Sequence, residues 1–251
     1  MRKKIYIPLA VACLTLVALA CQALSGGPVA TATEVMVQNT IAPVDTDVPL
    51  PTQTEEPLFS FGEIFEDDFT AGGRTSWGTG TDTESSVEYI DDGLNMQLFT
   101  ENYIVWSTPN ETEYEDVHME VTVYNNGSDS DTAFGFLCNQ QYPITDTRYY
   151  FAVTPGGEYA IGKSALAIDD VILSNNGEWG TSDLIAKDAA SYRLGADCGK
   201  GMLTLYVDGQ QIATASDSDN TSGRVALFLW SGEDISTVNV TFDDFVMTKL
   251  Q

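Results

Sequence analysis

Carboxylate side chains flank the single histidine of the sequence and could carry out acid–base chemistry. Asp116, His118 and Glu120 occupy alternate positions in the stretch Glu-Tyr-Glu-Asp-Val-His-Met-Glu. Glycoside hydrolysis needs two carboxyl groups beside the scissile bond, about 5–5.5 Å apart in retaining enzymes and further apart in inverting ones. Asp116 and Glu120 could form such a pair, but solvated acids around a surface-facing strand histidine are the simpler interpretation.

Aromatic residues near polar loop residues could instead bind a sugar. Such a site needs an aromatic face against sugar C–H groups and a few amides or carboxylates for the hydroxyls. Trp179 lies close to Asn176 and Glu178 in the loop-like stretch Asn-Asn-Gly-Glu-Trp-Gly. These three residues are the first ligand-binding candidates, and Trp230 and Tyr149 are the second. The alternative for each aromatic residue is packing in the protein core.

The four cysteines divide between the start of the chain and the rest of it. Cys13 lies in an apolar segment and Cys21 follows that segment, which leaves Cys138 and Cys198 in strand-like stretches. An even pair in an oxidising compartment predicts a disulfide. On a loop-entropy model the bridge would stabilise the fold by roughly 4 kcal/mol. The sequence has no Cys-x-x-Cys motif, so a zinc or redox dithiol site is not expected.

The first residues have the features of an export signal. A basic Met-Arg-Lys-Lys start precedes an uncharged apolar run that ends at Ala20. The run is short for a membrane span, which needs roughly 20 apolar residues, and fits a secretory signal over residues 1–20. With Cys21 it resembles a bacterial lipoprotein signal, although Ala18 stands where leucine is common. The resemblance implies cleavage before Cys21, lipid attachment there and an envelope location outside the cytoplasm; an ordinary cleaved signal or an uncleaved anchor helix are the alternatives.

Residues 21–57 have the composition of a disordered linker, rich in Thr, Val and Pro and without a steady hydrophobic period. Residues 58–251 then remain for one domain. The formal net charge of the chain is −26. This charge argues against nucleic acid as a partner and equally against anionic lipid. Attachment to a membrane would therefore depend on the lipid anchor and not on the surface of the domain. It could attract cations such as Ca²⁺, or it could serve solubility alone.

Alternating apolar residues in the domain predict strands and not helices. The alternation is clear over residues 117–123 and 202–207. Asp208-Gly209 and Gly156-Gly157 each separate two strand-like runs, which is typical of β-hairpins. The pattern slips by one position at Asp243-Asp244 near the end of the chain, which predicts a β-bulge. The sequence therefore predicts an all-β domain, a two-sheet antiparallel sandwich with its first and last strands side by side.

Several stretches of the domain carry a family resemblance: FEDDF followed by Trp77, AFGFLCNQ, YYFAVTPGGEYAIGK, LYVDGQQIA, GRVALFLW and VTFDDFVM. Together they resemble the concanavalin A-like lectin/glucanase superfamily over roughly residues 60 to 250. The nearest types are the laminin-G-like and 3-keto-disaccharide hydrolase-like jelly rolls of bacterial envelope proteins. The Glu-x-Asp-x-Glu strand of laminarinase-type members has no counterpart around His118. The resemblance therefore implies a jelly-roll fold more strongly than any activity.

The resemblance also implies a structural Ca²⁺ near the paired terminal strands. Ca²⁺ takes roughly six to eight oxygen ligands, mostly from carboxylates and carbonyls. Asp67 and Asp68 near the first strand, and Asp243 and Asp244 in the last, could supply some of them. The alternative is that these acids sit at a bulge and a sheet edge and face water.

These observations predict a lipid-anchored, extracytoplasmic β-sandwich that binds carbohydrate or another envelope ligand without turning it over. No recognisable catalytic motif supports an enzyme. Two alternatives stay open: a glycoside hydrolase of the 3-keto-disaccharide type, and a structural or protein-interaction module of the envelope.

Overall fold

The computed structural model describes residues 63–70, 77–142, 145–165, 168–233 and 238–250. These residues belong to one compact unit, residues 55–251. The predicted signal, the predicted lipidation site Cys21 and most of the predicted linker precede that unit in the sequence, and all three lie outside the described residues. Within the described ranges, no helix combines the length and the apolar character that crossing a bilayer requires.

The described part of the chain is built from strands joined by turns, with a single short 3-10 helix. The elements are β1 (Glu63–Asp67), β2 (Gly80–Thr81), β3 (Ser85–Ile90), β4 (Gly93–Leu98), β5 (Ile104–Ser107), β6 (Val117–Asn125), β7 (Ala133–Gln140), β8 (Arg148–Val153), β9 (Glu158–Ala165), β10 (Ile168–Ile172), η1 (Asn175–Gly177), β11 (Gly180–Thr181), β12 (Ser191–Gly199), β13 (Met202–Val207), β14 (Gln210–Ser216), β15 (Arg224–Trp230) and β16 (Val238–Lys249).

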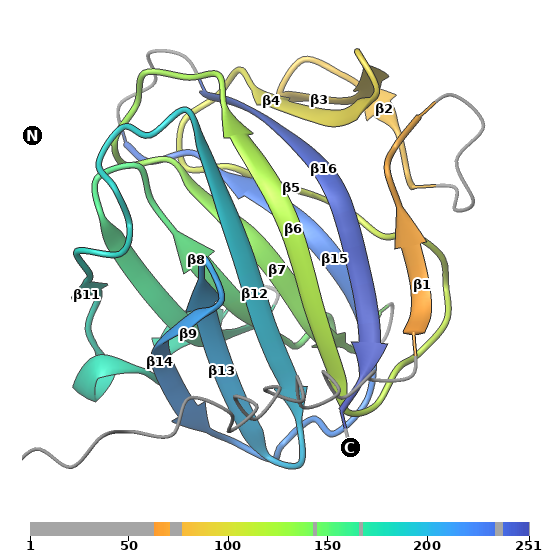
Figure 1. Ribbon diagram of the computed structural model, residues 1–251, viewed down its shortest axis with the longest axis vertical. Helices are drawn as coiled ribbons and strands as arrows, with labels where there is room; N and C mark the ends of the chain where they lie inside the picture. Colours follow the sequence, from red (N-terminus) through yellow and green to blue (C-terminus); the bar gives the residue numbers. More distant parts are fainter. Residues whose placement is uncertain (1–62, 71–76, 143–144, 166–167, 234–237, 251) are drawn as a thin grey trace, which may run out of the picture. The chain divides into compact units, whose positions relative to one another are not determined.

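The strands form two antiparallel sheets that pack face to face (Figure 1). The larger sheet has the order β14-β13-β12-β6-β16-β4-β3-β2, with β1 also paired to β16. The smaller sheet has the order β10-β9-β8-β7-β15-β5, with β11 paired to β9. In β6 every second residue from Val117 to Val123 is buried, as expected when one face of a strand meets the core and the other meets solvent. The predicted two-sheet antiparallel sandwich is confirmed.

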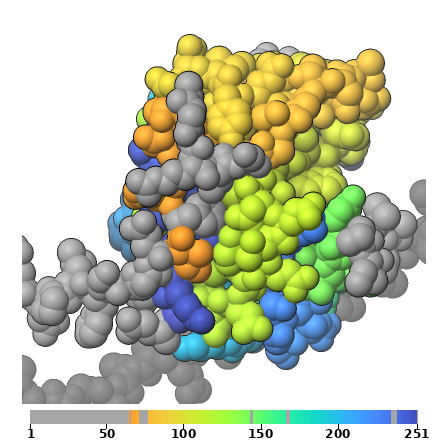
Figure 2. Space-filling model, turned by 90° about the vertical axis from the view of Figure 1, so that its right-hand side faces the viewer, coloured from red at the N-terminus to blue at the C-terminus, as the bar shows by residue number. Residues whose placement is uncertain are grey.

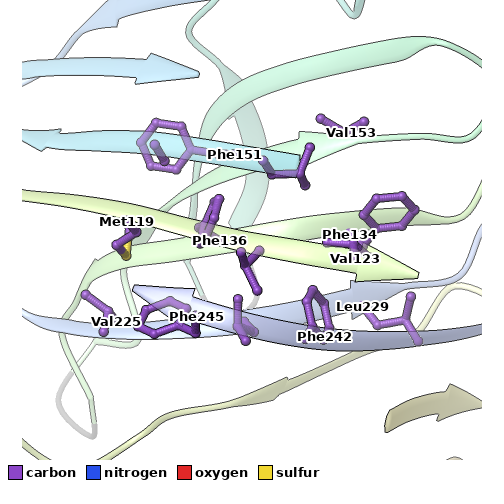
Figure 3. Close-up of a cluster of buried hydrophobic side chains, with 14 of the residues drawn as sticks. Met119, Val123, Phe134, Phe136, Phe151, Val153, Val225, Leu229, Phe242 and Phe245 are labelled. Carbon is purple, nitrogen blue, oxygen red and sulfur yellow. The ribbon is translucent and has the colours of Figure 1, made fainter. Parts of the chain in front are cut away.

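The core lies between the two sheets (Figure 3). β6 and β16 contribute Met119 and Phe242 from the larger sheet, and β7 and β8 contribute Phe136 and Phe151 from the smaller one. All four side chains are fully buried. The predicted disulfide between Cys138 and Cys198 is present, and because β7 and β12 belong to different sheets it joins the two layers covalently.

Two tight turns follow the sequence prediction. Asp208 and Gly209 connect β13 and β14 with φ angles of 50° and 71°. Positive φ at both central residues is the geometry that an Asp-Gly hairpin favours. Gly157 has a φ of 93° between β8 and β9. These turns set the register of the two hairpins.

The first and last strands of the domain lie side by side, as predicted. β1 pairs with β16 in antiparallel register, with Asp67 opposite Phe245. The pairing of β16 with β6 shifts register between Asp243 and Val246, which confirms the predicted bulge. Figure 2 shows β1 in orange beside the blue C-terminal strand, below the yellow β3 and β4.

Candidate functional site

The smaller sheet carries apolar side chains on its outer face as well as on its inner face. Ala133 and Leu137 of β7, Ala152 of β8, and Ala226 and Phe228 of β15 form a buried cluster separate from the core. Partly buried aromatic side chains pack against this cluster from neighbouring positions: Trp106, Tyr150 and Trp230. An outer sheet face with this composition differs from the polar outer face of an ordinary antiparallel sheet and indicates a contact surface.

A groove of about 350 Å³ lies over this face. Tyr150 and Phe228 line its floor, and Asp170 and Ile172 of β10 form part of its wall. Trp179 and Trp230 line it at one end. We call this space the arginine lobe, because Arg148 contributes the one cationic side chain among its lining residues.

The groove continues beyond the two tryptophans. A second hollow of about 360 Å³ is lined by Trp179 and Trp230 together with Asp131, Glu158 and Glu233. We call it the acidic lobe. Because the same two indole rings border both lobes, a chain-like ligand could run from one lobe to the other across them.

Arg148 is held in a fixed position at the floor of the arginine lobe. Its Nη1 donates a hydrogen bond to Oδ2 of Asp146 at 2.9 Å, and its Nε donates to Oγ of Ser164 at 3.1 Å. The guanidinium carbon lies 4.8 Å from the ring centroid of Trp106, a cation–π distance. Gln140 in turn donates to Oδ1 of Asp146 at 2.8 Å. A charge that is mostly buried is stable only with such partners, and here they also fix its orientation.

Two further polar groups of the arginine lobe have shifted protonation equilibria. Burial raises the pKa of Asp170, with the nearby Arg148 opposing that shift and Asp169 adding to it. Burial also raises the pKa of Tyr150, and the charge of Asp170 adds to the effect. The Tyr150 hydroxyl is therefore neutral at physiological pH. The lobe thus offers a fixed cation, a carboxylate and hydroxyl groups beside aromatic faces.

The structure brings together two of the residues that the sequence singled out as ligand contacts. Trp179 follows η1 in a loop and is 37% exposed, and Trp230 is the last residue of β15. Both line the groove. Asn176 and Glu178 are exposed in the same loop but do not line either lobe. The loop is held instead by Asn175, whose amide donates to the Trp179 carbonyl at 3.0 Å.

Tyr149 is a core residue, and its prediction as a ligand contact is wrong. Its side chain is fully buried on the inner face of β8, because successive side chains of a strand point to opposite sides. Its hydroxyl bonds to the Asp217 carboxylate and accepts a hydrogen bond from the backbone N–H of Asn220 at 3.1 Å. Its neighbour Tyr150 points outward and is the residue that lines the groove.

The predicted calcium ligands are divided among other roles. Both carboxylate oxygens of Asp67 are engaged, Oδ2 by the Trp77 indole N–H at 3.0 Å and Oδ1 by the Phe69 backbone N–H at 2.9 Å. Burial raises the pKa of Asp243, and the charges of Asp244, Asp68 and Asp92 add to the shift. Among the described residues, no three carboxylate, imidazole or thiol side chains are grouped to hold a metal ion. Asp67, Asp68, Asp243 and Asp244 therefore do not form one ligand set.

The sequence did not single out Arg148, Tyr150 and Phe228 as site residues. Their role depends on which face of the smaller sheet points outward, and β7 and β15 are apolar on both faces. Asp170 directly follows another acidic residue, Asp169, which by itself is typical of a solvated turn or strand edge. Its distance along the chain from Arg148 gave no sign that the two charges interact.

Comparison with known proteins identifies the fold. No protein-family model matches the sequence, and no curated protein does. Among solved structures, the chain is similar to the carbohydrate-binding module CBM66 from Bacillus subtilis, with 14% identity and a TM-score of 0.54 over 70% of this chain and 96% of that one. It is similar to a Bacillus subtilis protein with a galectin-like fold, at 10% identity and a TM-score of 0.56 over 75% and 96% of the two chains.

A Bacillus licheniformis β-glucanase is also similar, at 12% identity and a TM-score of 0.54 over 76% of this chain and 100% of that one. Likeness at such low identity concerns the fold. The domain has a jelly-roll β-sandwich fold like that of these structures, as the sequence resemblance implied.

Proposed function

We propose that the groove on the outer face of the smaller sheet binds a carbohydrate chain and holds it without cleaving it. The main support for this proposal is that Trp179 and Trp230 both line a groove that also contains the fixed guanidinium of Arg148. Aromatic rings stack on the C–H faces of sugars, while Arg148, Ser164 and Asp170 can bond to hydroxyl groups. The fold also occurs in a protein described as a carbohydrate-binding module and in a β-glucanase, which agrees with this proposal.

Binding fits the lining residues better than hydrolysis does. Asp170 is the one carboxylate among the described residues that line the arginine lobe. Asp131, Glu158 and Glu233 in the acidic lobe are all exposed. A glycosidase keeps its general acid partly shielded from water, so that the acid stays protonated near neutral pH. Hydrolysis by a pair of acids in the acidic lobe is the second candidate, and product analysis distinguishes it.

We also propose that the domain works outside the cytoplasm, attached to a membrane through lipid at Cys21. The basic and apolar leader supports this location, and so does the disulfide, because such bonds persist mainly in oxidising compartments. Two or more acyl chains would give stable attachment, whereas one chain is marginal. Intact mass spectrometry of protein from the membrane fraction tests this part: an unmodified N-terminus and protein free in the medium would contradict it.

A glycan array followed by calorimetric titration of any bound glycan tests the binding proposal. Trp230→Ala and Trp179→Ala should each weaken binding about tenfold or more, which corresponds to about 1.4 kcal/mol. Tyr124→Ala is the matched control, because Tyr124 is 41% exposed on the larger sheet and lines neither lobe. Trp179→Ala should leave the melting temperature nearly unchanged, since its side chain lies in a surface loop.

Three results would count against the proposal. Equal loss of binding and stability in Trp179→Ala would make that residue structural. A loss in Tyr124→Ala as large as in Trp230→Ala would place binding elsewhere. Shortened oligosaccharides after prolonged incubation would favour the glycoside hydrolase alternative.

A further inference from the structure

We propose that the groove selects glycans whose sugars carry a protonated amine, such as chains of de-N-acetylated hexosamine. This inference rests on the proposed carbohydrate binding and names the class of sugar. It follows from the charges of the two lobes and from their position relative to the shared tryptophans.

The acidic lobe presents carboxylates beside indole rings. Asp131, Glu158 and Glu233 line it together with Trp179 and Trp230. An ammonium group beside an indole face gains a cation–π attraction, and nearby carboxylates add charge-assisted hydrogen bonds. An amino sugar offers both features at once, because its ring has an apolar C–H face and its amine projects from the ring edge.

These carboxylates are available to a ligand. All three are exposed, and within the described residues no lysine or arginine forms an ion pair with them. The side chain of Lys187 passes Gly157, next to Glu158, without pairing to that carboxylate in the described part of the chain. In the described part of the chain, one side-chain hydrogen bond reaches these three carboxylates: Asp131 accepts it from the Ser130 hydroxyl at 3.3 Å.

The arginine lobe does not reverse this preference. The positive charge of Arg148 is compensated by its ion pair with Asp146 at 2.9 Å and by the nearby Asp170. The groove as a whole is therefore negative, within a chain whose formal net charge is −26. A sugar acid would meet repulsion from the acidic lobe and from the surrounding field, whereas a cationic sugar is attracted by both.

Two oligosaccharides that differ only in the amine test the inference. The β-1,4-linked glucosamine hexamer and its fully N-acetylated counterpart share length, linkage and ring shape. In calorimetric titrations at mildly acidic pH, where the amines are protonated, and about 0.15 M salt, the glucosamine hexamer should bind about tenfold more tightly. In Glu158→Gln/Glu233→Gln the ratio of the two affinities should fall to about one, whatever happens to the affinity for the acetylated hexamer itself.

A charge-matched control separates the site from the general field of the protein. The double variant Asp208→Asn/Glu88→Gln removes the same formal charge from two exposed residues of the larger sheet. Neither residue lines either lobe. Asn is compatible with the positive φ of Asp208. This control should keep the preference. A preference that falls equally in both double variants would overturn the inference in favour of unspecific attraction.

The remaining outcomes separate this inference from the proposed function. Equal binding of both hexamers, lost in Trp230→Ala, would keep carbohydrate binding and overturn the amine preference. If neither hexamer binds but the array shows another bound glycan, carbohydrate binding is likewise kept and the amine preference is overturned. Failure of both hexamers and of every glycan on the array would overturn the two proposals together.

Discussion

The Nδ1 atom of His118 lies 2.6 Å from Oδ1 of Asp197, directly across neighbouring strands β6 and β12. The contact is part of a row on the outer face of the larger sheet. Tyr206 donates its hydroxyl to Oδ2 of Asp197 at 2.7 Å, His118 Nε2 lies 3.3 Å from Glu120, and Arg193 donates to Glu120 at 2.8 Å. The single histidine thus sits between two carboxylates, which favours its charged form.

The pH dependence of stability should report this cluster. Burial alone would lower the pKa of His118, but its bonds to Asp197 and Glu120 outweigh burial and raise the pKa from 6.5 to about 9. The raised pKa contributes stability that is fully present below pH 6.5 and is lost as the pH rises to about 9. We expect a loss of about 1–3 kcal/mol in the free energy of unfolding across this range.

Urea unfolding of wild type and His118→Gln at several pH values measures the effect. The difference in the free energy of unfolding between the two proteins should shrink as the pH rises through this range, because wild type loses the contribution of charged His118. Tyrosine and lysine titrations are common to both proteins and cancel in the difference. A difference that stays constant with pH would contradict the assigned shift. In that case packing of the ring against Tyr206, whose centroid lies 5.9 Å away, would be the main contribution of His118.

Asp67→Asn should destabilise the fold by about 1–3 kcal/mol, because the side chain is buried and accepts two hydrogen bonds, from Trp77 and Phe69. An amide has one acceptor oxygen in place of two. Asp68→Asn is the control, since Asp68 is exposed and bonds to the nearby Thr70. Thermal melting with and without a chelator completes the test. A stabilising effect of Ca²⁺ that Asp67→Asn and Asp68→Asn both remove would support the calcium prediction.

Removal of the disulfide should cost roughly 4 kcal/mol on the loop-entropy model, since Cys138 and Cys198 are 60 residues apart in sequence. The double variant Cys138→Ala/Cys198→Ala, unfolded in urea, measures the cost without reductant. Wild type under reducing conditions should show a comparable loss. A change below about 1 kcal/mol would mean that the packing of β7 on β12 suffices to hold the two sheets together.

Arg148→Lys should weaken both stability and binding although it keeps the charge. A lysine cannot bond to Asp146 and Ser164 with the same planar fork, and it loses the stacking of guanidinium on Trp106. We expect about 1–2 kcal/mol in urea unfolding and a several-fold weaker glycan affinity. Arg224→Lys is the matched control, because its guanidinium lies over the exposed Tyr142 and its acidic partner Glu111 is largely exposed. Equal effects in both variants would argue against a special role for Arg148.

Much of the fold could be predicted from the sequence because its signals are local. The alternation over β6 and the Asp208-Gly209 turn depend on neighbouring residues, and both are present as expected. The phase slip at Asp243 likewise predicted a bulge that the register of β16 contains. Pairing of the two domain cysteines followed from their even number.

The site could be predicted only in part, because its geometry depends on contacts between distant residues. Trp179 was identified from its loop composition. The assignment of Tyr149 and not Tyr150 failed because β7, the strand beside them, is buried at every position and gives no alternation from which the outer face could be read. The position of the Arg148 guanidinium depends on contacts with Trp106 and Ser164, which belong to two other strands. No local sequence pattern indicates that these three residues meet.

The pairing of β1 with β16 determines where the preceding part of the chain joins the domain. Residue 63 belongs to the larger sheet, whereas both tryptophans stand over the exterior of the opposite layer. The described chain therefore enters the domain through the layer opposite the one that bears the proposed groove.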